Sequence, residues 1–338
     1  MDLVSLRPEG LYCAAGDFFI DPWRAVDRAV ITHAHADHAR GGHRHVLASQ
    51  DSEAVLRVRL GASLPFQGLA YGDRIDHHGV RISLHPAGHV LGSAQVRLEH
   101  AGQVWVASGD YFASGHDESN PTCPAFEPVR CHCFITESTF GLPLYRWAPQ
   151  AEILAQIGDW WRDNAATGHA SVLLAYSFGK AQRLLAGLDA DIGPMLVHGS
   201  VAAINEAYLA TGVDLPETAL LDSSTDPRVV ARALVVTPPN TLASPWARAL
   251  GPHRVAFASG WMQLRQARRR QGMDRGFALS DHADWPGLQR AIGATGAQRV
   301  IVTHGEEAVM VRWLRAQGLR AETFRTPFGD GEVGEAGD

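Results

Sequence analysis

The chain has 338 residues, which is enough for one large or two modest domains. Hydrophobic residues make up 46% and charged residues 20%, as in an ordinary globular protein, and no apolar run reaches the length of a membrane span. The formal net charge of −6 argues against polyanion binding by the whole surface but leaves room for a local basic channel. Four unevenly spaced cysteines, and an N-terminus without signal-peptide features, predict a cytoplasmic protein.

The residue pattern in the first third of the chain predicts short strands separated by turns. Apolar and polar residues alternate over 80–84 and 95–99, and more weakly over 104–107. Pro22 should end an earlier strand, because proline has no N–H to donate to a sheet. Many short strands at this spacing indicate a β-sandwich.

The pattern changes near residue 145. A helix is predicted over 150–164, followed by a buried strand over 172–176 and a helix over 180–188. Further apolar runs predict strands over 195–198, 233–237, 255–259, 277–280 and 300–303. Alternating strands and helices are typical of a parallel sheet flanked by helices.

Four candidate metal ligands follow the strand-like run 29–32: His33, His35, Asp37 and His38. Imidazole and carboxylate groups suit zinc and similar divalent metals. In an extended segment residues two apart point the same way, so His33 and His35 can hold one ion. A turn after His35 would bring Asp37 and His38 to a second ion, and two neighbouring ions are typical of metal-dependent hydrolases. The alternative is a histidine-rich loop that binds nothing.

Three further candidate ligands stand beside glycine at predicted strand ends: His89, Asp110 and His304. Each of them alone is more often a surface residue. Because they share one context with the first cluster, we expect all of them to collect along one edge of the sandwich.

With these motifs in this order, the chain resembles the metallo-β-lactamase superfamily and, more narrowly, the β-CASP nucleases, over nearly its whole length. The resemblance implies an α/β fold, a metallo-β-lactamase αββα sandwich with an inserted β-CASP domain whose parallel sheet is flanked by helices. It implies that the sandwich comprises residues 1–144 and 263–338 and that the insert comprises 145–262.

The resemblance also assigns the ligands to two divalent ions, with Zn²⁺ as the first choice and Mn²⁺ as the alternative. The implied ligands of the first ion are His33, His35 and His89. Those of the second are Asp37, His38 and His304, with Asp110 bridging both ions. Asp21 would support the ligand loop without binding metal, and a plain turn aspartate is the alternative interpretation.

Two motifs separate β-CASP nucleases from small-molecule hydrolases. Glu137, after the predicted strand 133–136, matches the first motif, and His282 within 279–284 matches the second. The alternatives are a strand-end acid and a helix-start histidine. In the implied reaction a metal-activated hydroxide attacks phosphorus, with Asp37 among the catalytic residues. His282 protonates the leaving oxygen, and Glu137 holds its ring and favours the protonated form.

Substrate contacts are predicted outside the metal site. Ser177 and Lys180 join a buried strand to a helix start, where exposed N–H groups favour a phosphate. Arg268 and Arg269 belong to a basic run that could contact a nucleic-acid backbone. A plain helix cap and a solvated helix face are the respective alternatives.

The stretch 10–23 resembles bacterial DNA ligase-associated exonucleases. This resemblance implies a DNA exonuclease acting in repair beside a ligase and a helicase. His304 occupies the third β-CASP position, where histidine is usual in RNA-cutting members, so an RNA-processing nuclease is the runner-up. A small-molecule metallo-hydrolase would need neither Glu137 nor His282, and a non-catalytic binding module is disfavoured because no ligand is missing.

Overall fold

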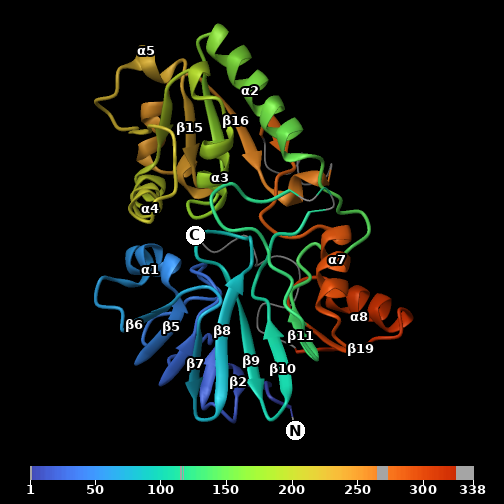
Figure 1. Ribbon diagram of the computed structural model, residues 1–338. Coiled ribbons are helices and arrows are strands. Elements are labelled where there is room, and N and C mark those ends of the chain that lie inside the picture. Colours follow the sequence, from blue (N-terminus) through green and yellow to red (C-terminus); the bar gives the residue numbers. More distant parts are fainter. Residues whose placement is uncertain (1, 115, 117, 265–272, 325–338) are drawn as a thin grey trace. The chain divides into compact units, whose positions relative to one another are not determined.

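Strands β1 to β11, together with β18 and β19, form two sheets (Figure 1). The structure is a computed structural model that describes residues 2–114, 116, 118–264 and 273–324. The first sheet has the order β1-β2-β3-β4-β5-β6. Its strands are β1 (Ser5–Arg7), β2 (Gly10–Cys13), β3 (Phe18–Ile20), β4 (Arg28–Val30), β5 (His45–Ser49) and β6 (Phe66–Leu69). Pairing within it changes from antiparallel to parallel at β3, since β3 to β6 run in the same direction.

The second sheet has the order β19-β18-β11-β10-β9-β8-β7. Its strands are β7 (Arg74–His77), β8 (Val80–Pro86), β9 (Ala94–His100), β10 (Gln103–Ala107), β11 (Cys133–Thr136), β18 (Arg299–Val302) and β19 (Arg320–Thr323). Alternate residues of β8, such as Ile82 and Leu84, join Phe18 and Val30 of the first sheet in one buried core. The expected packing of two sheets face to face is therefore present.

Helices cover the other face of the second sheet. Leu288 of α7 (Trp285–Thr295) and Met310 of α8 (Glu307–Ala316) pack with Phe134 and Val300 in a separate core. The helix α1 (Glu53–Leu60) and the 3₁₀ turn η1 (Gln50–Ser52) follow β5. These two sheets and their helices form unit 1, which includes the described residues up to Arg146 and from His282 onward.

Unit 2, Trp147–Asp281, contains a six-stranded sheet in which every pairing is parallel. The strand order is β14-β13-β15-β12-β16-β17. The strands are β12 (Ala170–Leu174), β13 (Met195–Val197), β14 (Ala219–Leu220), β15 (Leu234–Thr237), β16 (His253–Ala258) and β17 (Arg275–Phe277). The helices are α2 (Gln150–Ala166), α3 (Lys180–Gly187), α4 (Gly199–Ala210) and α5 (Pro227–Val230), with 3₁₀ turns η2 (Ala190–Ile192), η3 (Pro239–Ala243), η4 (Pro245–Leu250) and η5 (Gly260–Gln263).

The helices of unit 2 cover both faces of its sheet. Trp161 of α2 and Leu184 of α3 pack with Leu173 and Val236 on one face. On the other face, Leu250 of η4 packs with Val235. The parallel sheet flanked by helices that the sequence predicts is present here.

The boundaries of the two units differ from the expected bounds of 1–144, 145–262 and 263–338. The chain passes into unit 2 between Arg146 and Trp147 and returns to unit 1 between Asp281 and His282. The return is later than expected because β17 pairs with β16, which places the segment up to Asp281 with the sheet of unit 2.

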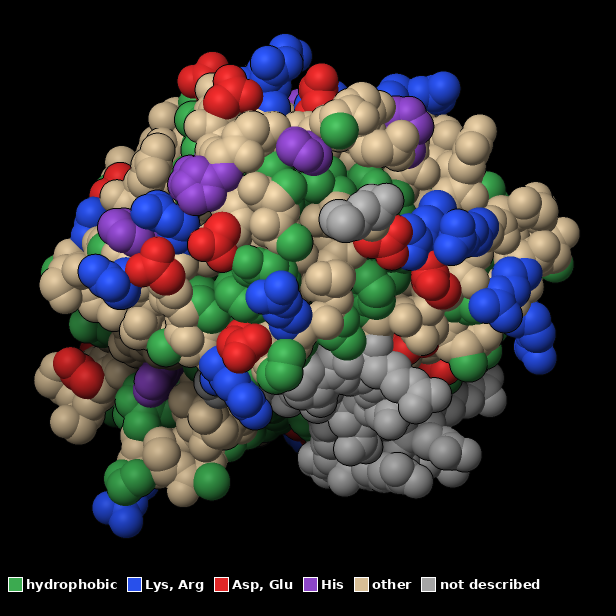
Figure 2. Space-filling model, turned by 90° about the horizontal axis from the view of Figure 1, so that it is seen from below, with side chains coloured by type: hydrophobic (Ala, Val, Ile, Leu, Met, Phe, Trp, Pro, Cys, Tyr) green, Lys and Arg blue, Asp and Glu red, His purple; other side chains and the backbone are tan. Residues whose placement is uncertain are grey.

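The surface carries both signs of charge. On the face shown in Figure 2, Lys and Arg side chains are interspersed with Asp and Glu. Ion pairs also lie on strands β7 to β9. Arg81 Nε lies 3.4 Å from Asp76 Oδ1, and Arg97 Nη1 lies 2.9 Å from Glu99 Oε2. In the part of the chain that the structure describes, no helix is long and apolar enough to cross a lipid bilayer.

Candidate dinuclear metal site

Strand ends of unit 1 bring the candidate ligands together. The strands β10, β11 and β18 are parallel neighbours, so their carboxyl ends meet at one edge of the sheet. This edge supplies Asp110 after β10, Glu137 after β11 and His304 after β18. His89 follows β8, and the cluster that begins with His33 follows β4.

The first group of ligand atoms belongs to His33, His35, His89 and Asp110, and these atoms all lie within 4.8 Å of one another. His35 Nδ1 lies 3.1 Å from His33 Nε2 and 3.1 Å from His89 Nε2. The Asp110 carboxylate completes the group, with Oδ2 3.5 Å from His33 Nε2. The structure therefore brings together the four residues that the resemblance assigns to the first ion and its bridge.

This spacing fits a bound cation. Two ligands of a tetrahedral zinc ion with bonds of 2.0–2.1 Å lie about 3.3 Å apart, and the distances around His35 are close to that value. His35 Nδ1 faces two other ring nitrogens and can donate at most one proton, so hydrogen bonding cannot account for both short distances. A divalent ion satisfies the whole donor set.

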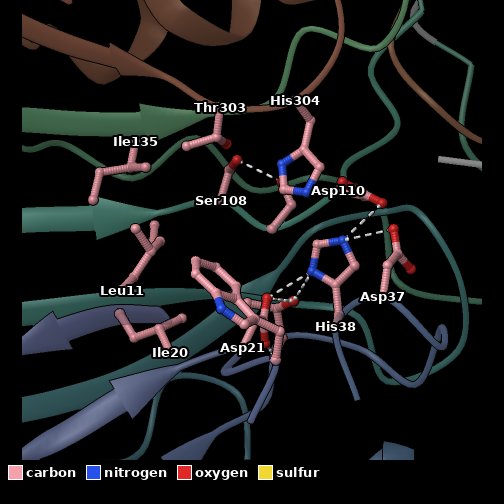
Figure 3. Close-up of a pocket in the computed structure, with 14 residues that line it drawn as sticks. Leu11, Ile20, Asp21, Asp37, His38, Ser108, Asp110, Ile135, Thr303 and His304 are labelled. Carbon is pink, nitrogen blue, oxygen red and sulfur yellow. Dashed lines mark hydrogen bonds and ion pairs between the residues drawn. The ribbon is translucent and has the colours of Figure 1, made fainter. Parts of the chain in front are cut away.

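The second group comprises Asp37, His38 and His304, whose ligand atoms also lie within 4.8 Å of one another. His38 Nε2 lies 3.6 Å from Asp37 Oδ2 and 3.3 Å from Asp110 Oδ2. His38 Nε2 and Asp37 Oδ2 are buried, and neither has a hydrogen-bond partner among the described residues. Figure 3 shows these side chains around a cavity of about 40 Å³. Buried polar atoms without partners at such a cavity fit a second ion.

Asp21 holds the loop that carries the second group. Its Oδ2 accepts hydrogen bonds from the Thr32 hydroxyl at 2.6 Å and faces His38 Nδ1 at 2.7 Å, while Oδ1 accepts from the Thr32 N–H at 2.7 Å. A carboxylate at Nδ1 directs the His38 proton to that nitrogen and leaves Nε2 for a metal. Asp21 has a φ of 44°, an uncommon conformation that this hydrogen bonding stabilises.

His304 also has a left-handed backbone, with a φ of 57°. Its carbonyl oxygen accepts hydrogen bonds from the N–H and the hydroxyl of Ser138, the residue after Glu137. The ends of β11 and β18 are therefore tied together at the residue that offers a ligand. Backbone strain of this kind is often found at functional sites.

A separate set of contacts fixes His89. The Asn120 side-chain amide donates to the His89 carbonyl at 2.9 Å, and the Ser93 hydroxyl accepts from the His89 N–H at 3.1 Å. Sequence reasoning missed Asn120, Ser93, Thr32 and Ser138. They act through contacts with backbone or supporting groups, and no local pattern marks such a role.

Glu137 and His282 form a buried pair within unit 1. His282 Nδ1 lies 2.9 Å from Glu137 Oε2, and both side chains are at most 2% exposed. Glu137 is itself fixed, because Oε1 accepts from the Tyr111 N–H at 2.8 Å and Oε2 accepts from the Thr139 hydroxyl. Asp110, Glu137 and His282 offer atoms within 4.8 Å of one another, so the pair adjoins the ligand groups.

Burial and carboxylates set the charges of the site. Burial lowers the pKa of His33 well below its usual range and also lowers the pKa of His304. Burial would lower the pKa of His38 as well, but the carboxylates of Asp110, Asp37 and Asp21 together raise it well above its usual range. The metal-free site therefore holds a proton on His38 and leaves His33 and His304 neutral, ready to act as ligands.

The predicted substrate contacts lie in unit 2. Ser177 and Lys180 are buried, at 6% and 2% exposure, and the Lys180 ammonium lies 3.5 Å from Asp281 Oδ2. Arg268 and Arg269 lie outside the described residues. A substrate-binding role for these four residues stays a prediction.

Comparison with known proteins finds relatives among nucleic-acid enzymes. No protein-family model matches the chain. A probable DNA ligase of Opitutus terrae is 33% identical to the chain, with 92% of this chain and 30% of that protein aligned. The endoribonuclease YSH1 of Mycosarcoma maydis is 27% identical, with 51% of this chain and 23% of that protein aligned. These similarities support the resemblance to β-CASP nucleases.

The chain spans less than a third of the length of these two relatives. Among solved structures, a protein of unknown function from Enterococcus faecalis V583 superimposes with a TM-score of 0.57 at 14% identity. That alignment covers 93% of this chain and 80% of the other, so the fold extends over both units.

Proposed function

We propose that the chain is a two-metal phosphodiesterase with a metallo-β-lactamase sandwich and an inserted β-CASP domain, and that it acts as a DNA exonuclease in repair. The observation that carries the proposal is the pair of ligand groups around Asp110 beside the buried Glu137–His282 pair. A small-molecule hydrolase would require the ligand groups alone.

Each side chain has a separate task in the proposed reaction. The residues His33, His35, His89, Asp37, His38 and His304 would hold the two ions, with Asp110 between them. Two divalent ions bound here supply the Lewis acidity that phosphodiester hydrolysis needs, with Zn²⁺ as the first choice and Mn²⁺ as the alternative.

His282 would act as the general acid. Glu137 Oε2 accepts a hydrogen bond from His282 Nδ1, so Nε2 is the nitrogen that can deliver a proton to the departing oxygen. The carboxylate also compensates the charge of the doubly protonated ring. Asp37 would contribute to catalysis as a ligand whose Oδ2 has no hydrogen-bond partner among the described residues.

The relatives support DNA and RNA as two candidate substrates. The relative named as a DNA ligase aligns with 92% of the chain, which favours DNA and a functional association with a ligase. An association with a helicase is proposed on the resemblance of residues 10–23 alone. The endoribonuclease relative aligns with about half of the chain, and His304 at the third β-CASP position favours RNA. We place DNA first because the DNA-related similarity extends over nearly the whole chain.

Contacts to the nucleic acid would come from unit 2. We propose Arg268 and Arg269 as phosphate contacts, together with Ser177 before the start of α3. The sequence predicts Lys180 alongside them, but it is 2% exposed and its ammonium is paired with Asp281, so we do not propose it as a contact. A local set of cations is required because the formal net charge of the chain is −6, so the surface as a whole repels a polyanion.

A cleavage assay tests the proposal. Purified protein is incubated with end-labelled single-stranded DNA, duplex DNA and RNA, with zinc or manganese. We compare it with His33→Ala and with His45→Ala, which alters an exposed histidine at the start of β5. Stepwise shortening of DNA by the native protein and His45→Ala, but not by His33→Ala, is the expected result.

Other outcomes of the same assay decide between the alternatives. Cleavage of RNA only would replace the DNA exonuclease with the RNA-processing nuclease. Hydrolysis of simple esters or thioesters without cleavage of any polymer would overturn the nuclease proposal and leave the small-molecule hydrolase.

A further inference from the structure

A buried arginine in unit 2 joins two distant segments of the chain. Arg183 lies in α3 and is 2% exposed. Its Nε donates to Gln150 Oε1 at 2.6 Å. Its Nη1 donates to the Ser280 carbonyl oxygen at 2.6 Å and to Asp281 Oδ1 at 3.0 Å. One planar guanidinium therefore fixes both segments at once.

These two segments are where the chain passes between the units. Gln150 is three residues beyond the boundary at Trp147, at the start of α2. Ser280 and Asp281 are the last residues of unit 2, and the next residue along the chain is His282. A shift of Arg183 would therefore displace Asp281 and the peptide bond that joins it to His282.

Asp281 is held by a second cation. Lys180, one turn before Arg183 on α3, places its ammonium 3.5 Å from Asp281 Oδ2. The three side chains are at most 5% exposed. Breaking a buried ion pair leaves an uncompensated charge, so this arrangement strongly restricts the position of Asp281.

The helix that carries both cations is itself anchored. The Gln182 carboxamide accepts from the Gly179 N–H at 2.8 Å and donates to the Ser177 carbonyl at 3.0 Å. It also donates to Asn205 Oδ1 in α4 at 2.8 Å. These contacts fix the start of α3 within unit 2, so Arg183 and Lys180 project from a rigid element.

We propose that Arg183, assisted by Lys180, is a positioning residue for His282. This inference rests on the proposed role of His282 as the general acid. Glu137 orients the ring of His282 from within unit 1, while Arg183 fixes the backbone of the residue before it. Both constraints are needed, because a displacement of about 1 Å at a catalytic group can reduce a rate about 100-fold.

The chemistry of the leaving group provides a selective test. An alkoxide leaving from DNA needs a proton, whereas p-nitrophenolate leaves readily without one. Loss of the general acid should therefore slow cleavage of DNA far more than hydrolysis of the p-nitrophenyl phosphodiester of thymidine. A general disturbance of the fold or of the metal ligands would slow both reactions alike.

The experiment measures kcat and KM on both substrates for Arg183→Gln, Arg183→Lys and His282→Ala. The control is Arg162→Gln, which removes an exposed arginine of α2 in the same unit. For Arg183→Gln we expect kcat on DNA to fall by about 10- to 100-fold with little change in KM. Hydrolysis of the p-nitrophenyl ester should stay within about threefold of the native rate. Arg183→Lys should recover part of the loss, and His282→Ala should show the same pattern more strongly.

Two further measurements keep the inference testable. Amide hydrogen exchange of the metal-free protein should be faster across residues 279–283 in Arg183→Gln than in Arg162→Gln. If Arg183→Gln does not fold, Gln150→Ala removes one of its partners and should give a smaller change in the same direction. Equal losses on both substrates, or no loss on DNA, would overturn the positioning role.

Failure of the proposed function would look different. If the native protein hydrolyses neither substrate, the proposed nuclease activity is wrong. Unchanged hydrogen exchange across 279–283 in Arg183→Gln would overturn the inference independently of any activity.

Discussion

At the scale of single residues, Asp110 lies close to both groups of candidate ligands. Its carboxylate lies 3.5 Å from His33 Nε2 in the first group and 3.3 Å from His38 Nε2 in the second. Burial would raise the pKa of Asp110, but His38 and other nearby histidines lower it well below its usual range. Asp110 is therefore ionised at neutral pH, as the proposed bridging role requires.

Replacing His282 should separate metal binding from turnover. We expect His282→Ala to keep both ions, because His282 belongs neither to the group of His33, His35, His89 and Asp110 nor to the group of Asp37, His38 and His304. Cleavage of nucleic acid should fall roughly 100- to 10,000-fold, the usual contribution of a general acid. Metal analysis and single-turnover cleavage measure the two effects. Full metal occupancy at an unchanged rate would exclude His282 as the acid.

The raised pKa of His38 predicts that metal binding releases a proton. The ordinary value is 6.5, and the neighbouring carboxylates raise it, so the metal-free site carries this proton at and above pH 6.5. A metal at Nε2 must displace it, so apparent affinity should increase with pH until His38 is deprotonated in the free site. Calorimetry in buffers with different ionisation enthalpies measures the released proton. No release at pH 7 would contradict this protonation state.

Sequence reasoning at this scale works where the ligands are local. The period of two in an extended chain was enough to pair His33 with His35. It could not find Asn120, which contacts His89 from 31 positions away. The contacts of Arg183 could not be predicted either, because its partners Gln150, Ser280 and Asp281 are distant in sequence and meet it only in the folded chain.

At the scale of elements, the site depends on where strands end. Parallel β10, β11 and β18 deliver their following residues to one edge. The predicted strands were found with small shifts; the strand expected over 172–176, for example, is β12 (Ala170–Leu174). The later boundary of unit 2 could not be predicted, because it depends on the pairing of β17 with β16, which no local pattern encodes.

Gly305, beside His304, tests how closely the ends of β11 and β18 must approach. Its φ is 73°, and a Cβ there would overlap the Ser138 carbonyl. Gly318 has a φ of 83° but nothing within 4 Å of an added Cβ, so it is a matched control. Each alanine should cost roughly 1–2 kcal/mol for its left-handed backbone. Gly305→Ala should lose more, and it should also bind the second ion at least about tenfold more weakly, because His304 must move.

Denaturant unfolding and metal analysis of the two variants make this comparison. Equal stability losses, with two ions retained in both proteins, would show that the close approach at Gly305 does not determine the position of His304.

At the scale of the whole molecule, each unit has cores of its own. The two sheets of unit 1 share one core, and both faces of the parallel sheet in unit 2 are covered separately. All of the candidate ligands and the Glu137–His282 pair belong to unit 1. The sequence predicts two domains because its pattern changes along the chain. Apolar and polar residues alternate with a period of two in the first third, and predicted strands alternate with predicted helices from about residue 145.

The central claim is that two ions held by these ligands are required for phosphodiester cleavage. The most direct measurement is a titration of the metal-free protein with zinc or manganese while cleavage of labelled single-stranded DNA and RNA is followed. We predict little turnover with one equivalent of metal and full turnover with two, and none at any ratio in Asp110→Asn. Full turnover at one equivalent, or no cleavage of either polymer with two ions bound, would contradict the account.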